Sequence, residues 1–504
     1  MRPEIAYAEL IRRTREELLL ASCAQLLAWD EDTYMPPAGV EHRAAQLALL
    51  AGLLHERATD PRLGEVLGEV EGSPLVADPE SAEAVNVREI RRDFARQARL
   101  PRALVEELAR ITSLAEQEWA AARRAADFPR FRPWLEKIVR LKRCEADALA
   151  LTADPYDALL DGYEPGARGD DLAGLFDALR RELVPLVNVL TYSPPRRPDT
   201  SVLRRPVPVE KQRAFGEAVA AAVGFDFRRG RLDTTTHPFF SPLGRDDCRI
   251  TARFAEQRFS EGVLTILHEV GHGLYEQGLP PEHHGTPVGE VSSLGMHESQ
   301  ARLWENTVGR SRPFWQHFFP AAQAAFPGAL SDVSPDDFHF AVNAVEASLI
   351  RVGADEVTYN LHILIRFELE RALIAGDLAT ADLPDAWNKA HRHYLGVVPR
   401  DDGEGCLQDG HWAAGMFGYF PTYTLGNVFA AQLFARARQE LGDIDEAFAR
   451  GDFGGLLGWL REKVYRQGGR YPAKRLIERV TGGPPDHRPL VDGLRAKYGE
   501  LYGI

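Results

Sequence analysis

The chain has 504 residues, of which 44% are hydrophobic, so it is long enough to bury a large core. Its 60 lysines and arginines against 74 aspartates and glutamates give a net charge of −14. That balance argues against binding to nucleic acids or anionic membranes, which requires clustered basic charge. We therefore expect no nucleic-acid partner and no membrane partner.

The N-terminal twenty residues are charged and amphipathic, and they lack the apolar stretch of a secretory signal. No run of about 18 apolar residues suggests a membrane span. The cysteines are widely spaced, without a Cys-x-x-Cys pair, so we expect reduced core thiols rather than disulfides at Cys23, Cys144, Cys248 and Cys406. These features predict a soluble, cytoplasmic protein.

Helical periodicity dominates the first 190 residues. Apolar residues recur at intervals of three and four, as on an amphipathic helix, in segments 6–30, 81–100, 101–127, 131–153 and 170–190. The prolines of Thr191–Glu210 then interrupt this pattern. Because helical patterning resumes directly afterwards, we interpret this segment as a long connection within one domain, residues 1–504.

A short β signal covers Arg231–Phe254, where β-branched and aromatic residues gather. It stands directly before a helical pattern, Leu264–Gln277, that contains two histidines. The sequence therefore predicts a mainly α protein with a small sheet beside that helix.

That helix has the spacing of a metal site. Ser260 is expected to cap it and Gly278 to end it. His268 and His272 are four residues apart, which places both imidazoles on one face, with Glu269 beside them. Two such histidines can bind one Zn²⁺ while the glutamate takes a proton from water. The alternative is a pair of buried histidines with ordinary hydrogen bonds.

A catalytic zinc site needs a third protein ligand. Glu298 is the best candidate, because a second helix is expected over 295–307 and the loop before it is long enough to turn back. A surface charge is the alternative interpretation of Glu298. His297, His283 and His284 are the other possible ligands, although the last two lie in a loop rich in proline and glycine.

Seven ordered segments resemble the carboxypeptidase Taq family of zinc metallocarboxypeptidases, nearly from end to end. These segments are Trp29–Gln46, His237–Phe239, Asp247–Thr251, His268–His272, His297–Gln300, Ile350–Asp355 and Gly405–Trp412. The resemblance implies a large helical body with a deep cleft, similar to angiotensin-converting enzyme and the thimet-type oligopeptidases. It also implies a homodimer with one Zn²⁺ per subunit, for which Co²⁺ can substitute.

The resemblance further implies roles for individual residues. His268, His272 and Glu298 would be the zinc ligands, and Glu269 the general base and then acid. Peptide hydrolysis also needs donors for the tetrahedral oxyanion. By analogy with related helical zinc peptidases we assign His411 and Tyr423 to this role, with Tyr419 as the second choice. The alternative for these tyrosines is an aromatic core.

A carboxypeptidase must also recognise a free carboxylate, for which the arginine fork is suited. Arg351 is the first choice and Arg249 the second, while a buried salt bridge is the alternative for both. His237 is expected to line the cleft or to cap a turn. Other polar residues are expected to orient neighbours rather than contact substrate, namely Asp355, Gln408 and Asp409.

The His-x-His pair of His391 and His393 is not expected to bind metal, because positions i and i+2 of a helix do not share a face.

The predicted function is release of single C-terminal residues from peptides, with broad specificity. An oligopeptidase or dipeptidyl-carboxypeptidase on the same scaffold is the nearest alternative. A non-catalytic peptide-binding protein is disfavoured because binding alone does not require Glu269. A structural zinc site is disfavoured because such sites usually fill all four positions with Cys and His.

Overall fold

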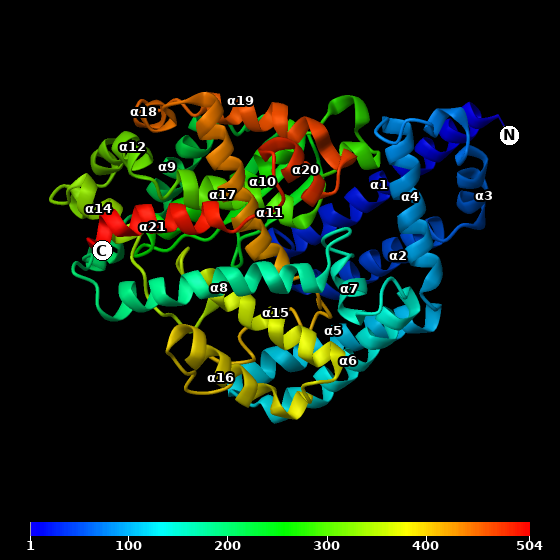
Figure 1. Ribbon diagram of the computed structural model, residues 1–504, viewed down its shortest axis with the longest axis horizontal. Coiled ribbons are helices and arrows are strands. Elements are labelled where there is room, and N and C mark those ends of the chain that lie inside the picture. Colours follow the sequence, from blue (N-terminus) through cyan, green and yellow to red (C-terminus); the bar gives the residue numbers. More distant parts are fainter. Residues whose placement is uncertain (1) are drawn as a thin grey trace.

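The computed structural model describes residues 2–504 and is mainly helical, as expected (Figure 1). The helices before the sheet are α1 Pro3–Thr33, α2 Val40–Ala58, α3 Pro61–Val70, α4 Ala82–Arg99, α5 Arg102–Ala125, α6 Phe128–Leu149, α7 Pro155–Leu160, α8 Gly169–Tyr192 and α9 Val209–Ala222. The five helices expected in this part correspond to α1, α4, α5, α6 and α8. The proline-rich connection contains only a short 3₁₀ turn, Thr200–Arg204.

The helices after the sheet include those of the expected metal site. They are α10 Phe259–Gly278, α11 Leu294–Arg302, α12 Arg312–Ala325, α13 Pro327–Leu330, α14 Pro335–Val342, α15 Tyr359–Ala375, α16 Leu383–Leu395, α17 Pro421–Leu441, α18 Ile444–Ala449, α19 Gly454–Lys463, α20 Ala473–Thr481 and α21 Arg488–Tyr502. A π-helical segment, η6 Leu303–Val308, continues α11.

The predicted small sheet is present. Its strands are β1 Gly230–Thr234, β2 Phe240–Gly244 and β3 Asp247–Ala252, in the order β1-β3-β2. β1 is parallel to β3, with Leu232 opposite Ile250, and β2 is antiparallel to β3, with Phe240 opposite Ile250. The ring of Phe240 lies 5.8 Å from that of His272, so the sheet packs directly beside α10, the helix that carries His272.

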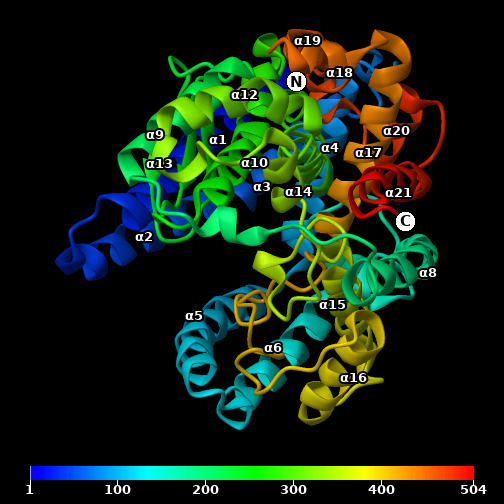
Figure 2. The ribbon, with the colours of Figure 1, turned by 90° about the vertical axis from the view of Figure 1, so that its left-hand side faces the viewer.

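Two groups of helices are visible when the molecule is turned (Figure 2). One contains α5, α6, α15 and α16, and the other contains α9, α10, α12–α14 and α17–α21. Buried apolar residues of both groups belong to one continuous core, and a smaller cluster joins α1, α3 and α4. Among residues 2–504, none of the helices combines the length and the apolar character that a bilayer crossing requires.

All four cysteines are free thiols, but only two of them belong to the core. Cys248 and Cys406 are buried as expected, whereas Cys23 and Cys144 are exposed on α1 and α6. The expectation of core thiols is therefore wrong for the latter two, because each lies outside the buried stripe of its amphipathic helix.

Candidate metal centre

Helix α10 carries both histidines of the expected site. It begins at Phe259, with Arg258 as the N-cap residue, and no side chain caps it. The prediction that Ser260 is the cap is therefore wrong: Phe259 is buried in the core and belongs to the first turn, so the helix starts two residues earlier. Gly278 is the last helical residue, so the predicted end is correct within one position.

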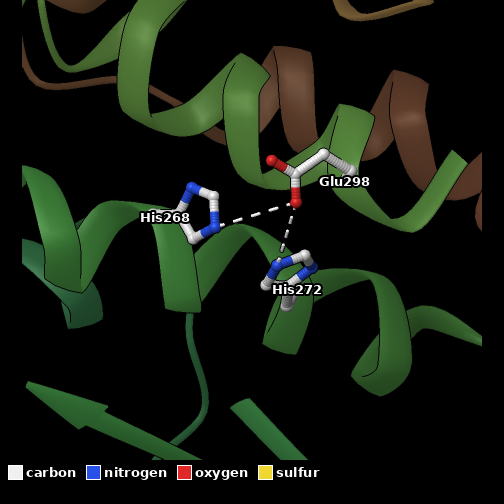
Figure 3. Close-up of side chains that lie close together, drawn as sticks. All are labelled: His268, His272 and Glu298. Atoms are coloured by element: carbon white, nitrogen blue, oxygen red, sulfur yellow. Dashed lines mark ion pairs between the residues drawn. The ribbon is translucent and has the colours of Figure 1, made fainter. Parts of the chain in front are cut away.

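His268, His272 and Glu298 converge, as Figure 3 shows. Glu298 Oε2 lies 3.9 Å from His268 Nε2 and 3.7 Å from His272 Nε2, and the three ligand atoms lie within 4.8 Å of one another. A tetrahedral zinc ion with ligands at about 2.1 Å separates adjacent ligand atoms by roughly 3.4 Å. The two distances from Glu298 Oε2 exceed that spacing by only a few tenths of an ångström, and the donor set of two imidazoles and one carboxylate suits zinc, so the residues fit a zinc ion.

A second layer of charged groups orients these ligands. Glu305 Oε2 lies 2.9 Å from His268 Nδ1, which favours a proton on Nδ1 and leaves Nε2 as the free donor atom. Arg302 donates from Nε to Glu298 Oε1 at 2.7 Å, which leaves Oε2 directed at the histidines. Burial alone would raise the pKa of Glu305, but the charges of Arg302 and His268 lower it to about 2, so Glu305 is a carboxylate.

Sequence reasoning missed Arg302 and Glu305. Arg302 stands four residues after Glu298, a spacing at which helix side chains meet, so this partner was accessible from the sequence. Glu305 lies in the π-helical segment, and its contact with His268 depends on how that segment packs on α10. π-Helical turns often occur at functional sites.

The other histidines considered as ligands lie outside the group. The ring of His297 stacks on that of His272 at 4.4 Å, and its Nε2 lies 3.1 Å from Glu276 Oε1. His283 and His284 lie at a short 3₁₀ turn and are not part of the cluster. His297 therefore packs on the ring of one candidate ligand and lies outside the candidate group.

Glu269 is buried, with 6% of its surface exposed. Burial raises its pKa to about 7, against the opposing charge of His268. A carboxyl with a pKa near neutrality can both accept and return a proton, as a general base requires.

Close packing at two glycines holds the three helices of the site together. A Cβ added at Gly271 of α10 would lie 2.5 Å from Gln300 O and 2.6 Å from Ala301 Cα of α11. A Cβ at Gly426 of α17 would lie 2.5 Å from Glu298 Cγ. Only glycine allows these approaches, so α11 is fixed between α10 and α17.

We expect Gly426→Ala to weaken metal binding by roughly 10- to 100-fold, the effect typical of displacing groups that orient a ligand. The added methyl group would displace Glu298 from the two histidines. Gly174→Ala is the matched control, since that helical glycine on α8 has no atom within 4 Å of its Cβ position. Competition with a zinc chelator measures both affinities. An unchanged affinity in Gly426→Ala would contradict the role of this contact.

The predicted oxyanion donors lie together beside the metal ligands. His411 Nε2 is 3.2 Å from the Tyr423 hydroxyl, and the ring of Tyr419 lies 5.3 Å from that of Tyr423. The ring of Tyr423 lies 6.1 Å from that of Tyr359, and the guanidinium of Arg302, which donates to Glu298, lies 4.3 Å from the Tyr359 ring. Burial and then the charge of Glu298 raise the pKa of Tyr419 to about 12. Burial and the charge of Arg351 lower the pKa of His411 to about 4, so it is neutral at pH 7.

Arg351 occupies a buried network near these tyrosines. Its Nε and Nη2 donate to Asp409 Oδ1 at 3.0 and 2.8 Å, and its Nη1 donates to the Tyr359 hydroxyl at 3.0 Å. Arg366 Nε donates to Asp409 Oδ2 at 2.6 Å. Two guanidinium groups therefore share one carboxylate, so the salt bridge leaves one positive charge uncompensated. The Arg351 guanidinium is 5.0 Å from the ring of Tyr423.

The polar neighbours of Arg351 orient the backbone and side chains. Gln408 Oε1 accepts from Arg351 N at 2.9 Å and from Arg366 Nη2 at 2.8 Å. Asp355 accepts from the backbone N–H groups of Glu346, Val357 and Thr358, which closes the loop that carries Arg351. These contacts match the orienting role expected from the sequence.

The structure does not bring Arg249 or His237 into the group of metal ligands and tyrosines described above. Both arms of the Arg249 fork pair with Asp247 at 2.9 Å, and its guanidinium lies 4.2 Å from the ring of Trp29. This is the salt bridge that was the alternative for Arg249. His237 is exposed in the connection between β1 and β2.

The His-x-His pair on α16 is split between two environments. His391 is buried, with its Nδ1 3.1 Å from Trp387 O, whereas His393 is exposed.

Comparison with known proteins identifies the family. A model of the carboxypeptidase Taq (M32) metallopeptidase family matches residues 9–498. Thermostable carboxypeptidase 1 of Thermus thermophilus is 52% identical over 512 residues, with both chains covered completely. Carboxypeptidase 1 of Bacillus subtilis is 37% identical over 477 residues, 95% of each chain.

Solved structures agree with these sequence relatives. The M32 carboxypeptidase of Deinococcus radiodurans R1 matches with a TM-score of 0.96 at 43% identity, over 99% of this chain and 100% of that one. A carboxypeptidase of Pyrococcus furiosus matches with a TM-score of 0.93 at 34% identity, over 98% and 99%. The chain therefore belongs to the carboxypeptidase Taq (M32) metallopeptidase family and is a metallocarboxypeptidase, a hydrolase of peptide bonds.

Proposed function

We propose that the enzyme releases single amino acids from peptides with a free C-terminal carboxylate, using one Zn²⁺ per subunit. The observation that carries this proposal is the pairing of two features within one site. His268, His272 and Glu298 converge on one point beside Glu269. The Arg351 guanidinium, whose charge is not fully compensated, lies 5.0 Å from the ring of Tyr423. The charge of Glu298 raises the pKa of the neighbouring Tyr419.

When bound, Zn²⁺ would supply a Lewis acid that polarises the scissile carbonyl and lowers the pKa of water. Glu269 takes the proton from the attacking water and later returns it to the leaving amine, so no covalent intermediate with the protein forms. Neutral His411 and the Tyr423 hydroxyl donate hydrogen bonds to the developing oxyanion.

Arg351 binds the substrate carboxylate and thereby fixes which peptide bond is cleaved. Arg351 shares the single negative charge of Asp409 with Arg366, so a second anion beside Arg351 is strongly stabilised. Charge-assisted hydrogen bonds are strong in a site of low dielectric constant. Tyr419 lines the same region and contacts the peptide. Arg249 and His237 are retained as secondary substrate-binding candidates toward the β-sheet side of the site.

Further expectations rest on the sequence and on the family resemblance. Residues 1–504 form one catalytic domain whose two helical halves flank a deep cleft. The subunit forms a homodimer, located in the cytoplasm. Broad specificity is expected at the C-terminal residue.

Metal removal and return test the cofactor. Dialysis against a chelator should abolish peptidase activity, and titration with Zn²⁺ should restore it with an end point at one ion per subunit. Co²⁺ should restore it as well. His272→Ala should remain inactive at the same zinc concentrations. Full activity of the metal-free protein, or an end point at two ions, would contradict the proposed site.

A further inference from the structure

A buried carboxylate of α15 binds both ends of the segment 411–419. The carboxylate belongs to Glu370, which is fully buried, and its Oε1 accepts from Trp412 Nε1 at 2.8 Å. Its Oε2 accepts from the Tyr156 hydroxyl at 2.8 Å and from Gly418 N at 3.1 Å. One carboxylate therefore binds three donors, and two of these donors belong to the segment.

The hydrogen bonds of 411–419 make its conformation dependent on this carboxylate. The segment contains no helix or strand. Apart from bonds to the adjacent Gly410 and to the first residues of α17, every hydrogen bond between the segment and the rest of residues 2–504 goes to Glu370. Glu370 therefore fixes a part of the chain that no regular structure holds.

The two residues bound by the carboxylate stand next to side chains of the candidate site. Trp412 directly follows His411, and Gly418 directly precedes Tyr419. His411 Nε2 in turn lies 3.2 Å from the Tyr423 hydroxyl. A displacement of either end of the segment would therefore move His411 or Tyr419. Misplacing a group in an active site by about 1 Å can lower the rate by about 100-fold.

Only a carboxylate satisfies all three donors at this position. An indole N–H and a backbone N–H can donate but cannot accept, so both oxygens of the side chain must offer lone pairs. Burial raises the pKa of Glu370 to about 7, and the hydrogen bonds from Trp412, Tyr156 and Gly418 limit this rise. An amide of the same shape would turn its NH₂ group toward at least one donor.

We propose that Glu370 is a positioning residue for peptide hydrolysis, whose carboxylate holds both ends of 411–419 and thereby keeps His411 and Tyr419 in place beside the candidate metal ligands. Glu370 acts through the segment and does not belong to the group of ligands. This inference rests on the proposed function, because it requires that His411 and Tyr423 stabilise the oxyanion.

Glu370→Gln tests the inference by steady-state kinetics of the zinc-loaded enzyme. We expect kcat to fall by about 10- to 100-fold, because the amide NH₂ displaces one end of the segment. KM should change by less than about threefold, since Arg351, the proposed partner of the substrate carboxylate, is held by Asp409 and not by Glu370. Zinc content should stay at one ion per subunit.

Tyr156→Phe is the matched control. It removes a buried hydrogen bond to the same carboxylate but leaves both bonds to the segment. The melting temperature Tm should fall, whereas kcat should stay within about twofold, because the net loss is one hydrogen bond distant from the substrate. A merely structural role of Glu370 would lower Tm in both variants and kcat in neither.

Trp412→Phe in the Glu370→Gln background should act as a rescue. The phenyl ring has no N–H, so the amide NH₂ can face it while the amide oxygen accepts from Tyr156 and Gly418. The kcat of the double variant should therefore equal or exceed that of Glu370→Gln. An unchanged kcat in Glu370→Gln, an equal loss in Tyr156→Phe, or losses that multiply in the double variant would overturn the proposal.

His411→Gln and Tyr423→Phe separate this inference from the proposed function. If these two variants lose kcat and Glu370→Gln does not, the positioning role is wrong and the proposed function stands. If neither variant loses kcat, the role of His411 and Tyr423 at the oxyanion is wrong, and the positioning role of Glu370 is wrong with it.

Discussion

Glu269→Gln is expected to lower kcat/KM by at least about 1,000-fold, in the range that loss of a general base produces. The amide cannot accept a proton from water or return one to the leaving amine, yet it occupies nearly the same volume. Because Glu269 is not among the converging ligand atoms, zinc content should stay at one ion per subunit. Steady-state kinetics and metal analysis on the same preparation measure both quantities.

The matched comparison for this variant is Glu276→Gln. Glu276 lies two turns further along α10, is also buried, and contacts His297 rather than the three-residue cluster. It should reduce activity far less than Glu269→Gln. Retention of substantial activity in zinc-loaded Glu269→Gln would show that another group accepts the proton.

Arg351→Gln is expected to raise KM for a peptide with a free C-terminus by about 100-fold, the loss typical of a buried charge-assisted contact. Asp409 keeps Arg366 as a partner in the variant, so the network loses its surplus positive charge rather than exposing an unpaired carboxylate. The preference for a free acid over the corresponding amide should therefore largely disappear. Kinetics on the two peptides give this ratio directly.

Arg249→Gln distinguishes the two arginines. Arg249 is paired with Asp247 through both arms of its fork, so its removal should leave the acid-to-amide preference intact. If the preference for the free acid were lost in Arg249→Gln and kept in Arg351→Gln, Arg249 on strand β3 would be the residue that binds the substrate carboxylate.

The convergence of the three candidate metal ligands was predictable because the spacing of residues along a helix is rigid. His268 and His272 share a face wherever α10 lies, and Glu298 required only that the chain turn back. The contacts that complete the site were not predictable in this way. Glu305 reaches His268 through the π-helical segment, and Gly426 matters because α17, more than a hundred residues later, packs on Glu298.

Errors at Ser260, Cys23 and Cys144 have the same origin. Local sequence rules identify residues that are suited to cap a helix or to lie in the core. Whether a given residue does so depends on which of its neighbours are buried in the folded chain. Helix α2 was not predicted, because its apolar residues form no buried stripe: Arg43 is its only buried residue.

Product analysis by mass spectrometry tests the central claim most directly. The zinc-loaded enzyme would be incubated with a peptide carrying a free C-terminus and with its C-terminally amidated twin. Our account predicts a ladder of single-residue losses from the free peptide and almost none from the amide. Loss of two residues at a time, or internal cleavage of both peptides, would contradict release of single C-terminal residues and the role of Arg351.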